Sequence, residues 1–401
     1  MVGGLPCAIL PDITGGGQFP TLQAETGIMT TNTPPSIHSL DTPALLVDIT
    51  KVQRNATTMI QRCQQMGVSL RPHMKTHKTI EAGEIMTNGT KRHIVVSTLA
   101  EAEFYANHGF DDVLFAQPLT QDKVQRCAQL VAQLEEFHVM IDSSSGLDAI
   151  NSRPLSRKQW SVFLKVDCGY GRAGVSHDSA DGVDLVKSLV STPGVKFAGL
   201  YAHCGDSYNS DSPEDVKAVG HRTAQNILAF AERLKQEGVE SPTVSIGSTP
   251  TCSQPADTMG QLTEIHPGNY IFYDVQQSLL GSCKLEDIAG RVMTRVIGHY
   301  PQNGHLLVDC GWTALSLHSL GQLPTGFGII DGHPELKLSS MTQEVGKVHA
   351  VEGTLDFDKY PIGTVLKILP YHACATACMH PKYYVHSGED IVAVWKPCRG
   401  W

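Results

Sequence analysis

The spacing of apolar residues along the chain predicts a long alternation of strands and helices. Short apolar runs recur from residue 68 to residue 266, and segments with apolar residues at helical spacing lie between most of them. The clearest helical segments are 51–67, 98–109 and 214–238, the last of which ends on a glycine signal. We expect strands at 68–75, 93–98, 112–116, 137–141, 162–167, 195–203, 243–247 and 262–266. This alternation indicates parallel βαβ units, and eight such strands close a barrel.

The pattern changes near residue 285. Short β-rich runs such as "RVMTRVIGHY" and "IVAVWKP" follow, separated by polar turns and without long helical segments. We therefore expect an α/β protein, a (β/α)8 barrel plus a C-terminal all-β domain. Its parts would be a disordered leader at 1–38, rich in Gly, Thr and Pro, an initial strand and helix at 39–67, the barrel at 68–284 and the β-domain at 285–401. We expect the early strand, 44–50, to pair with the β-domain.

Composition narrows the class of protein. The 401 residues exceed what one core usually needs, and a net charge of −9 without a basic patch argues against nucleic acid as the main partner. Eleven scattered cysteines, an odd number, favour a reduced cytoplasmic chain. No apolar run approaches the roughly 18 residues of a membrane span, and the apolar start lacks the basic residues of a signal peptide.

The stretch "RPHMKTHKT" at 71–79 places charged and imidazole side chains at alternate positions. On a strand, Arg71, His73, Lys75 and His77 share one face, and a barrel interior would hold them together at a high cost unless they have partners. An inward Lys75 suggests a Schiff base to a phosphorylated aldehyde, with Arg71 and His73 disfavouring its charged form. Spacing alone leaves open a lysine that merely ends a strand at the solvent.

Two loops follow the last two expected barrel strands, where barrel enzymes often bind phosphate. Gly247, Ser248 and Thr249 form the first, and Gly268, Asn269 and Tyr270 form the second. Backbone N–H groups and short polar side chains suit a phosphate dianion, although each loop alone is equally compatible with an ordinary turn. The chain contains no GxGxxG or GxxxxGK[ST] pattern, which excludes the usual dinucleotide and Walker sites.

Two further groups lie at the ends of expected barrel strands. Lys165 and Asp167 share a strand face, and glycines bracket Arg172 in the tight turn that follows. A structural ion pair supporting this loop is an alternative interpretation. Tyr201 and His203 share a face at the end of the next strand and could cover or hydrogen-bond a ring.

The β-domain carries a possible metal site in "PYHACATACMH". His372 and Cys374 are two residues apart, so on a strand they would point the same way, and imidazole with thiolate suits zinc. Two protein ligands would leave positions for water or substrate. A buried cysteine beside a satisfied histidine is the alternative, and the offset of Cys378 and His380 makes a four-ligand structural site strained.

In combination, these motifs resemble the eukaryotic D-serine dehydratase family. The matching segments are "RPHMKTHKT", "KVDCGYGRAGV", "YAHCG", "SIGSTP", "HPGNY", "VDCGWTALS" and "HACATACMHPKYYVH", and the resemblance runs from about residue 39 to Trp401. The family consists of pyridoxal-phosphate enzymes of the alanine-racemase fold type, related to D-threonine aldolase. The resemblance implies that Lys75 carries the cofactor, with Lys78 as second choice.

The resemblance also implies roles for the other candidates. Tyr201 would meet the pyridine nitrogen, His203 and Arg172 would contact the cofactor, and His372 with Cys374 would bind Zn²⁺. The six residues of the two glycine-containing loops would hold the phosphate. The implied assembly is a head-to-tail homodimer in which the zinc pair reaches the cofactor of the other subunit.

The implied reaction converts D-serine to pyruvate and ammonia. Trp312 stands where racemases place a tyrosine base, which disfavours racemisation, and a thiolate at Cys374, where aldolase relatives usually carry aspartate, favours zinc. Relatives often have a histidine at the position of Val345, so rate or substrate choice could differ here. Two alternatives remain: an aldolase acting on D-threonine or other D-3-hydroxy amino acids, and a non-catalytic pyridoxal-phosphate-binding protein.

Overall fold

The computed structural model describes residues 34–319 and 321–401. Residues 1–33 of the expected leader lie outside this part of the chain. Its last residues, 34–38, lie inside it: Ser36 forms an antiparallel bridge with Asp390, and Ile37–Ser39 forms a short 3₁₀ helix, η1. Within the described chain, no helix has the length and apolar character needed to cross a membrane.

All eight expected barrel strands are present in one parallel sheet. They are β2 (Ser69–Leu70), β3 (Ile94–Val96), β4 (Val113–Pro118), β5 (Phe137–Ile141), β6 (Trp160–Asp167), β8 (Val195–His203), β9 (Thr243–Gly247) and β10 (Glu264–Ile265). Their order is β2-β10-β9-β8-β6-β5-β4-β3, and the short β7 (Val175–Ser176) pairs with β6. A parallel bridge between His73 and Val95 joins the two ends of this order. The sheet therefore curls round on itself, which confirms the predicted barrel.

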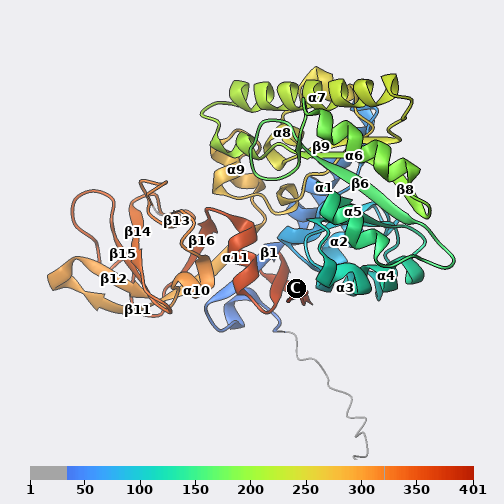
Figure 1. The fold of residues 1–401 in the computed structure, drawn as a ribbon. Helices are drawn as coiled ribbons and strands as arrows, with labels where there is room; N and C mark the ends of the chain where they lie inside the picture. Colours follow the sequence, from blue (N-terminus) through green and yellow to red (C-terminus); the bar gives the residue numbers. More distant parts are fainter. Residues whose placement is uncertain (1–33, 320) are drawn as a thin grey trace, which may run out of the picture. The chain divides into compact units, whose positions relative to one another are not determined.

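Helices follow the strands and pack around the sheet (Figure 1). They are α1 (Ile49–Met66), α2 (Ile80–Met86), α3 (Leu99–Ala106), α4 (Val124–Gln133), α5 (Ser144–Asn151), α6 (Ala180–Ser191), α7 (Pro213–Gln236), α8 (Thr249–Ser253) and α9 (Val275–Leu279). The longest of these, α7, begins at the N-cap Ser212 and ends just before Gly238, whose φ of 80° suits the turn out of a helix.

Residues 290–395, together with the early strand β1, form the second, mostly antiparallel sheet. Its strands are β1 (Ala44–Asp48), β11 (Gly290–Tyr300), β12 (His305–Val308), β13 (Gly328–Ile330), β14 (Leu336–Met341), β15 (Gly346–Ala350), β16 (Val365–Pro370), β17 (Tyr383–Ser387) and β18 (Asp390–Trp395). The early strand β1 lies between β11, to which it is antiparallel, and β17, to which it is parallel. Two short helices interrupt the strands, α10 (Trp312–Leu315) and α11 (Ala373–Met379).

The strand expected at 68–75 ends earlier than the alternation predicts. Arg71 follows β2 and is buried inside the barrel, where it bonds Glu264 at 2.9 Å and Asp112 at 2.6 Å. After His73 the backbone turns into a 3₁₀ helix, η2 (Met74–Thr76). The expected common face of four alternating residues is therefore wrong, because a helical turn rotates Lys75 out of the strand register.

Candidate functional site

A cavity of about 840 Å³ lies at the C-terminal ends of the barrel strands. Eleven of the twelve candidate site residues line it: Lys75, Arg172, Tyr201, His203, Gly247, Ser248, Thr249, Gly268, Asn269, His372 and Cys374. Tyr270 is the exception, since its fully buried side chain packs in the hydrophobic core. The fold thus brings residues from both halves of the chain to one place, the end of a barrel where active sites are found.

Lys75 projects into this cavity from η2. Burial lowers the pKa of Lys75 more than the nearby Cys374 raises it, and Arg172 lowers the pKa further. Arg71, expected to have this effect, is instead occupied by its two carboxylate partners. Lys78 does not line the cavity, because its Nζ pairs with Glu101 at 2.6 Å.

Lys165 is a second buried lysine in the cavity. The ion pair with Asp167 considered from the sequence does not form in the described chain. Lys165 Nζ instead lies 4.4 Å from the centre of the Tyr201 ring, and Asp167 Oδ1 accepts backbone N–H bonds from Gly169 and Gly171 at 3.0 Å. Burial, followed by the charge of Arg172, lowers the pKa of Lys165 to about 7. Its place inside the apolar run "VFLKV" is the sequence signal for this burial.

Neutral aromatic and imidazole rings form the wall beside these lysines. Tyr201 stacks on His266 with ring centres 3.7 Å apart, and His203 Nδ1 lies 2.8 Å from the Gly247 carbonyl oxygen. Burial, together with the neighbouring lysines, lowers the pKa values of His73, His203 and His266 well below the usual range. His73, which the sequence analysis placed beside Lys75, lines the cavity, whereas sequence reasoning gave no role to His266, although it directly follows β10.

The two glycine-containing loops meet on one side of the cavity. A Cβ at Gly247 would come within 2.7 Å of the His266 ring, and one at Gly268 within 2.7 Å of the His73 carbonyl oxygen, so both positions require glycine. Thr249 Oγ1 and Asn269 Oδ1 are buried polar atoms without a hydrogen-bond partner in the described chain. Buried polar groups are normally satisfied, so these atoms indicate that a polar ligand completes the loops.

His372 and Cys374 lie side by side, but not on a strand. His372 is the N-cap of α11 and Cys374 is in the first turn of that helix. Cys374 Sγ lies 3.1 Å from Thr76 Oγ1, on the residue next to Lys75. Burial opposes charge on both groups, yet the Cys374 thiolate raises the pKa of His372 to about 9, and the His372 imidazolium lowers the pKa of Cys374.

The expected reach of this pair across a dimer interface is wrong for this structure. His372 and Cys374 line the same cavity as Lys75 of their own chain. Intrachain hydrogen bonds hold them there: the Ala373 N–H donates to Asp274 at 2.8 Å, and the Tyr383 hydroxyl donates to the His77 carbonyl at 3.0 Å.

His318 is a cavity residue that sequence reasoning missed. Its Nδ1 lies 2.5 Å from His372 Nδ1, a contact that no local spacing could reveal because the two are far apart in the sequence. Within the described residues, no group of three His, Cys, Asp or Glu side chains is arranged to hold a metal ion. His372 and Cys374 are therefore a two-donor pair. Trp312, at the start of α10, and Val345, in the turn between β14 and β15, do not line the cavity.

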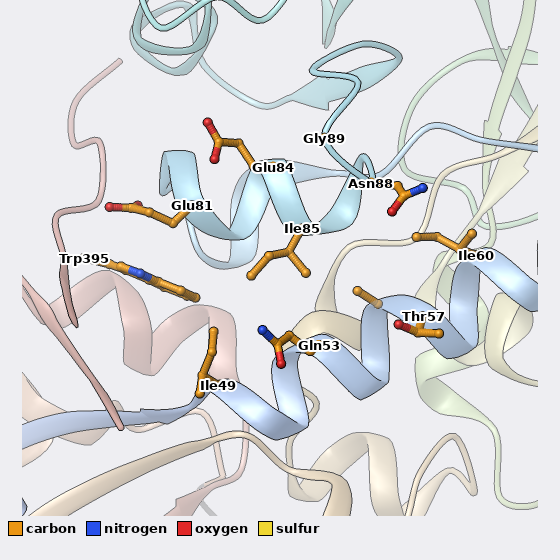
Figure 2. Close-up of a pocket in the computed structure, with 11 residues that line it drawn as sticks. Ile49, Gln53, Thr57, Ile60, Glu81, Glu84, Ile85, Asn88, Gly89 and Trp395 are labelled. Atoms are coloured by element: carbon orange, nitrogen blue, oxygen red, sulfur yellow. The ribbon is translucent and has the colours of Figure 1, made fainter. Parts of the chain in front are cut away.

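A second hollow, of about 550 Å³, lies between α1 and α2 (Figure 2). Ile49, Ile60 and Ile85 contribute apolar surface, and the Trp395 ring lies at one end. The charged residues that line it are Glu81 and Glu84, the latter paired with Lys91 at 2.7 Å. None of the candidate site residues lies in this groove.

Comparisons with known proteins agree with this arrangement. Residues 47–275 match the family model "Alanine racemase, N-terminal domain", and residues 289–386 match "Putative serine dehydratase domain". The chain is 38% identical to a D-serine dehydratase of Dictyostelium discoideum, over 91% of this chain and 98% of that protein. It is 32% identical to the D-threo-3-hydroxyaspartate dehydratase of Delftia sp. HT23, whose structure superimposes with a TM-score of 0.85 over 92% of this chain and 100% of that one. A cysteine-to-alanine mutant of the same enzyme, 31% identical, has been solved in the metal-free form, with a TM-score of 0.85 over 91% of this chain and 100% of that one.

Proposed function

Because the chain belongs to the D-serine dehydratase family built on the alanine-racemase fold, we propose that it converts D-serine to pyruvate and ammonia with pyridoxal phosphate and Zn²⁺. Overall, D-serine loses ammonia only, because the water lost in the elimination is returned when the resulting imine is hydrolysed. The steps that the protein must assist are removal of the α-proton and departure of the β-hydroxyl.

The cavity fits pyridoxal phosphate. A buried amine with a lowered pKa, at Lys75, suits attachment of an aldehyde, because the neutral form is the nucleophile. In the same cavity, the unpartnered Thr249 hydroxyl, which can donate a hydrogen bond, and the close-packed Gly247 and Gly268 offer a polar cradle for a phosphate. Tyr201 and His203 would flank the ring. The role given to Tyr270 from the sequence could come only from its backbone, since its side chain points into the core.

The bound cofactor would supply an electron sink for the substrate α-carbon. Lys75 would act as the general base that takes the α-proton, since its lowered pKa keeps a fraction of the amine neutral near neutral pH. The imidazoles of His73, His203 and His266, whose pKa values are lowered by burial, add no further positive charge near Lys75.

The chemistry of His372 and Cys374 fits Zn²⁺. Imidazole and thiolate are preferred zinc donors, and the lowered pKa of Cys374 keeps the thiolate available. A two-donor site leaves coordination positions free for water and substrate. Zinc there would act as a Lewis acid on the β-hydroxyl, a poor leaving group when unassisted.

One observation carries the proposal: the 3.1 Å contact between Cys374 Sγ and Thr76 Oγ1. It brings His372 and Cys374 of α11 close to the residue adjacent to Lys75. This supports the proposal, because a base for the α-carbon and a Lewis acid for the β-oxygen would then act on one bound substrate.

The direct test is a pyruvate assay on D-serine with zinc present and after removal by a chelator. We expect pyruvate and ammonia in equal amounts, loss of turnover with the chelator and recovery on adding zinc. Turnover that is insensitive to the chelator would contradict the role of His372 and Cys374.

The same assay separates the alternatives. D-threo-3-hydroxyaspartate would report the activity named for the Delftia relative, and glycine formed from D-threonine would report aldolase activity. A protein that binds the cofactor but turns over none of these D-amino acids would be a carrier.

We also propose a homodimer in a reducing compartment, the cytoplasm. All ten described cysteines are free thiols, and most are buried. Exposed apolar side chains at Trp312, Leu317 and Met379, on or beside α10 and α11, provide surface for association. Sedimentation of the purified protein would give the subunit number.

A further inference from the structure

A buried carboxylate links the two ligand-binding sides of the cavity. Asp274, fully buried, is the N-cap of α9 and follows the loop that begins at Gly268. Its Oδ2 accepts hydrogen bonds from Asn269 Nδ2 at 2.6 Å and from the Ala373 N–H at 2.8 Å. Its Oδ1 accepts the Gln277 N–H at 2.9 Å.

The position of Ala373 gives these bonds their importance. Ala373 lies between His372 and Cys374, so its peptide N–H sets the direction from which both side chains leave the backbone. A second bond, from the Gln276 N–H to the Tyr371 carbonyl at 3.0 Å, holds the same segment against α9. Asn269 Nδ2 also lies 3.7 Å from Cys374 Sγ.

The charge of Asp274 also needs an explanation. Burial has the largest effect on the pKa of this carboxyl and raises it. The charge of His372 has the next largest effect and lowers this pKa. A buried anion is costly unless a cation compensates it. In this structure the three hydrogen bonds that Asp274 accepts provide part of that compensation.

We propose that Asp274 is a positioning residue for the metal, which orients the His372–Cys374 pair through the Ala373 N–H and ties it to the loop carrying Asn269. This rests on the proposed zinc site. Partners that orient metal ligands without touching the metal typically change its affinity by about 10- to 100-fold.

Two substitutions at Asp274 and one at Ala373 test this. D274A removes all three bonds, and D274N keeps the shape but lacks the carboxylate charge. A373P removes one N–H at the first position of α11, where proline is well tolerated, and the extended His372 (φ −132°, ψ 103°) suits a residue before proline.

The readout is zinc affinity of the cofactor-loaded protein, measured by competition with a chromogenic chelator, alongside cofactor absorbance and thermal unfolding. We expect the zinc Kd to rise about 10- to 100-fold in D274A and D274N and several-fold in A373P. A Kd within twofold of wild type in folded D274N and A373P would overturn the proposal, even with reduced thermal stability.

Asp309 provides the matched control. It also caps a backbone N–H, that of Arg295 at 2.8 Å, and accepts a hydroxyl bond from Thr294 at 2.6 Å, but it belongs to the second sheet and not to the cavity. D309A should lower the unfolding temperature and leave the zinc Kd unchanged. If wild type itself binds no zinc, the proposed function fails; if wild type and D274N bind zinc equally, only this inference fails.

Discussion

The barrel mouth and the groove between α1 and α2 are hollows of similar size, about 840 and 550 Å³, but their linings differ in kind. The barrel mouth gathers two lysines, several imidazoles and a thiol, most with pKa values shifted by burial. The groove is lined by isoleucines, a tryptophan and glutamates on ordinary helix surfaces (Figure 2). Convergence of buried ionisable groups, and not the hollow itself, therefore distinguishes the candidate functional site.

Removing the central amine of the barrel mouth should have the largest effect. We expect K75A to lower pyruvate formation from D-serine by about 10⁴-fold or more, because both cofactor attachment and proton transfer are lost. Borohydride reduction of the loaded wild type followed by peptide mapping should find the cofactor on Lys75. K78A is the control, since Lys78 is engaged with Glu101, and it should keep the cofactor attached. A label on Lys78 would contradict the assignment.

Removing the thiol should have the next largest effect. We expect C374A to lower turnover by about 10²- to 10³-fold and to bind zinc weakly, with the cofactor retained. Metal content measures the loss of zinc binding, and pyruvate formation measures the loss of turnover. C378A, one helical turn further along α11 and exposed, should behave like wild type. Equal metal content in C374A and wild type would exclude Cys374 as a ligand.

Lys165 should affect stability with a definite pH dependence. Its pKa of about 7 in the folded apoprotein lies below the unfolded value of about 10.4, so between these values the unfolded chain binds more protons and the free energy of unfolding rises with pH. K165M should stabilise the apoprotein at pH 7 by on the order of 1–4 kcal/mol and flatten this rise. Urea unfolding at pH 7 and pH 9.5 measures both the stabilisation by K165M and the change of the unfolding free energy with pH. An unchanged slope would mean that Lys165 titrates normally.

A substitution in the groove should have the smallest effect. Ile85 is partly buried, so I85A should cost about 1 kcal/mol or somewhat more in unfolding free energy, with turnover and zinc content within twofold of wild type. The same urea titration and pyruvate assay apply. A large loss of turnover would break the contrast between the two hollows and give the groove a role in the reaction.

The order of elements was predictable from the sequence because the spacing of apolar residues, and the residues that begin and end helices, are local features. The longer barrel strands have apolar runs, and α7 has Ser212 before it and Gly238 after it. The path of the chain at Lys75 was not predictable, because β2 ends at Leu70, a tertiary bridge beyond it joins His73 to Val95, and the next residues form η2. His372 and Cys374 were identified by residue type, but their helical setting was not.

The remaining site residues were beyond local reasoning. His318 reaches His372, and Asp274 reaches Ala373, only through the packing of distant segments. The Lys165–Asp167 pairing failed because the strand ends at Asp167, whose carboxylate then caps the N–H groups of the following loop. The local sequence pattern shows the type of each residue and the face of the strand or helix on which it lies. The hydrogen-bond and ion-pair partners of that residue depend on the assembled fold.

The place of β1 has a consequence for how the enzyme is made. Ala44 to Val47 pair with β11, and Leu46 to Asp48 pair with β17, near the opposite end of the polypeptide. As the ribosome produces the chain, this strand cannot pair with β11 until the whole barrel has emerged, nor with β17 until most of the second sheet has emerged. Such distant pairing is slow, and it means that a nascent chain holds no assembled catalytic centre until its two ends have met.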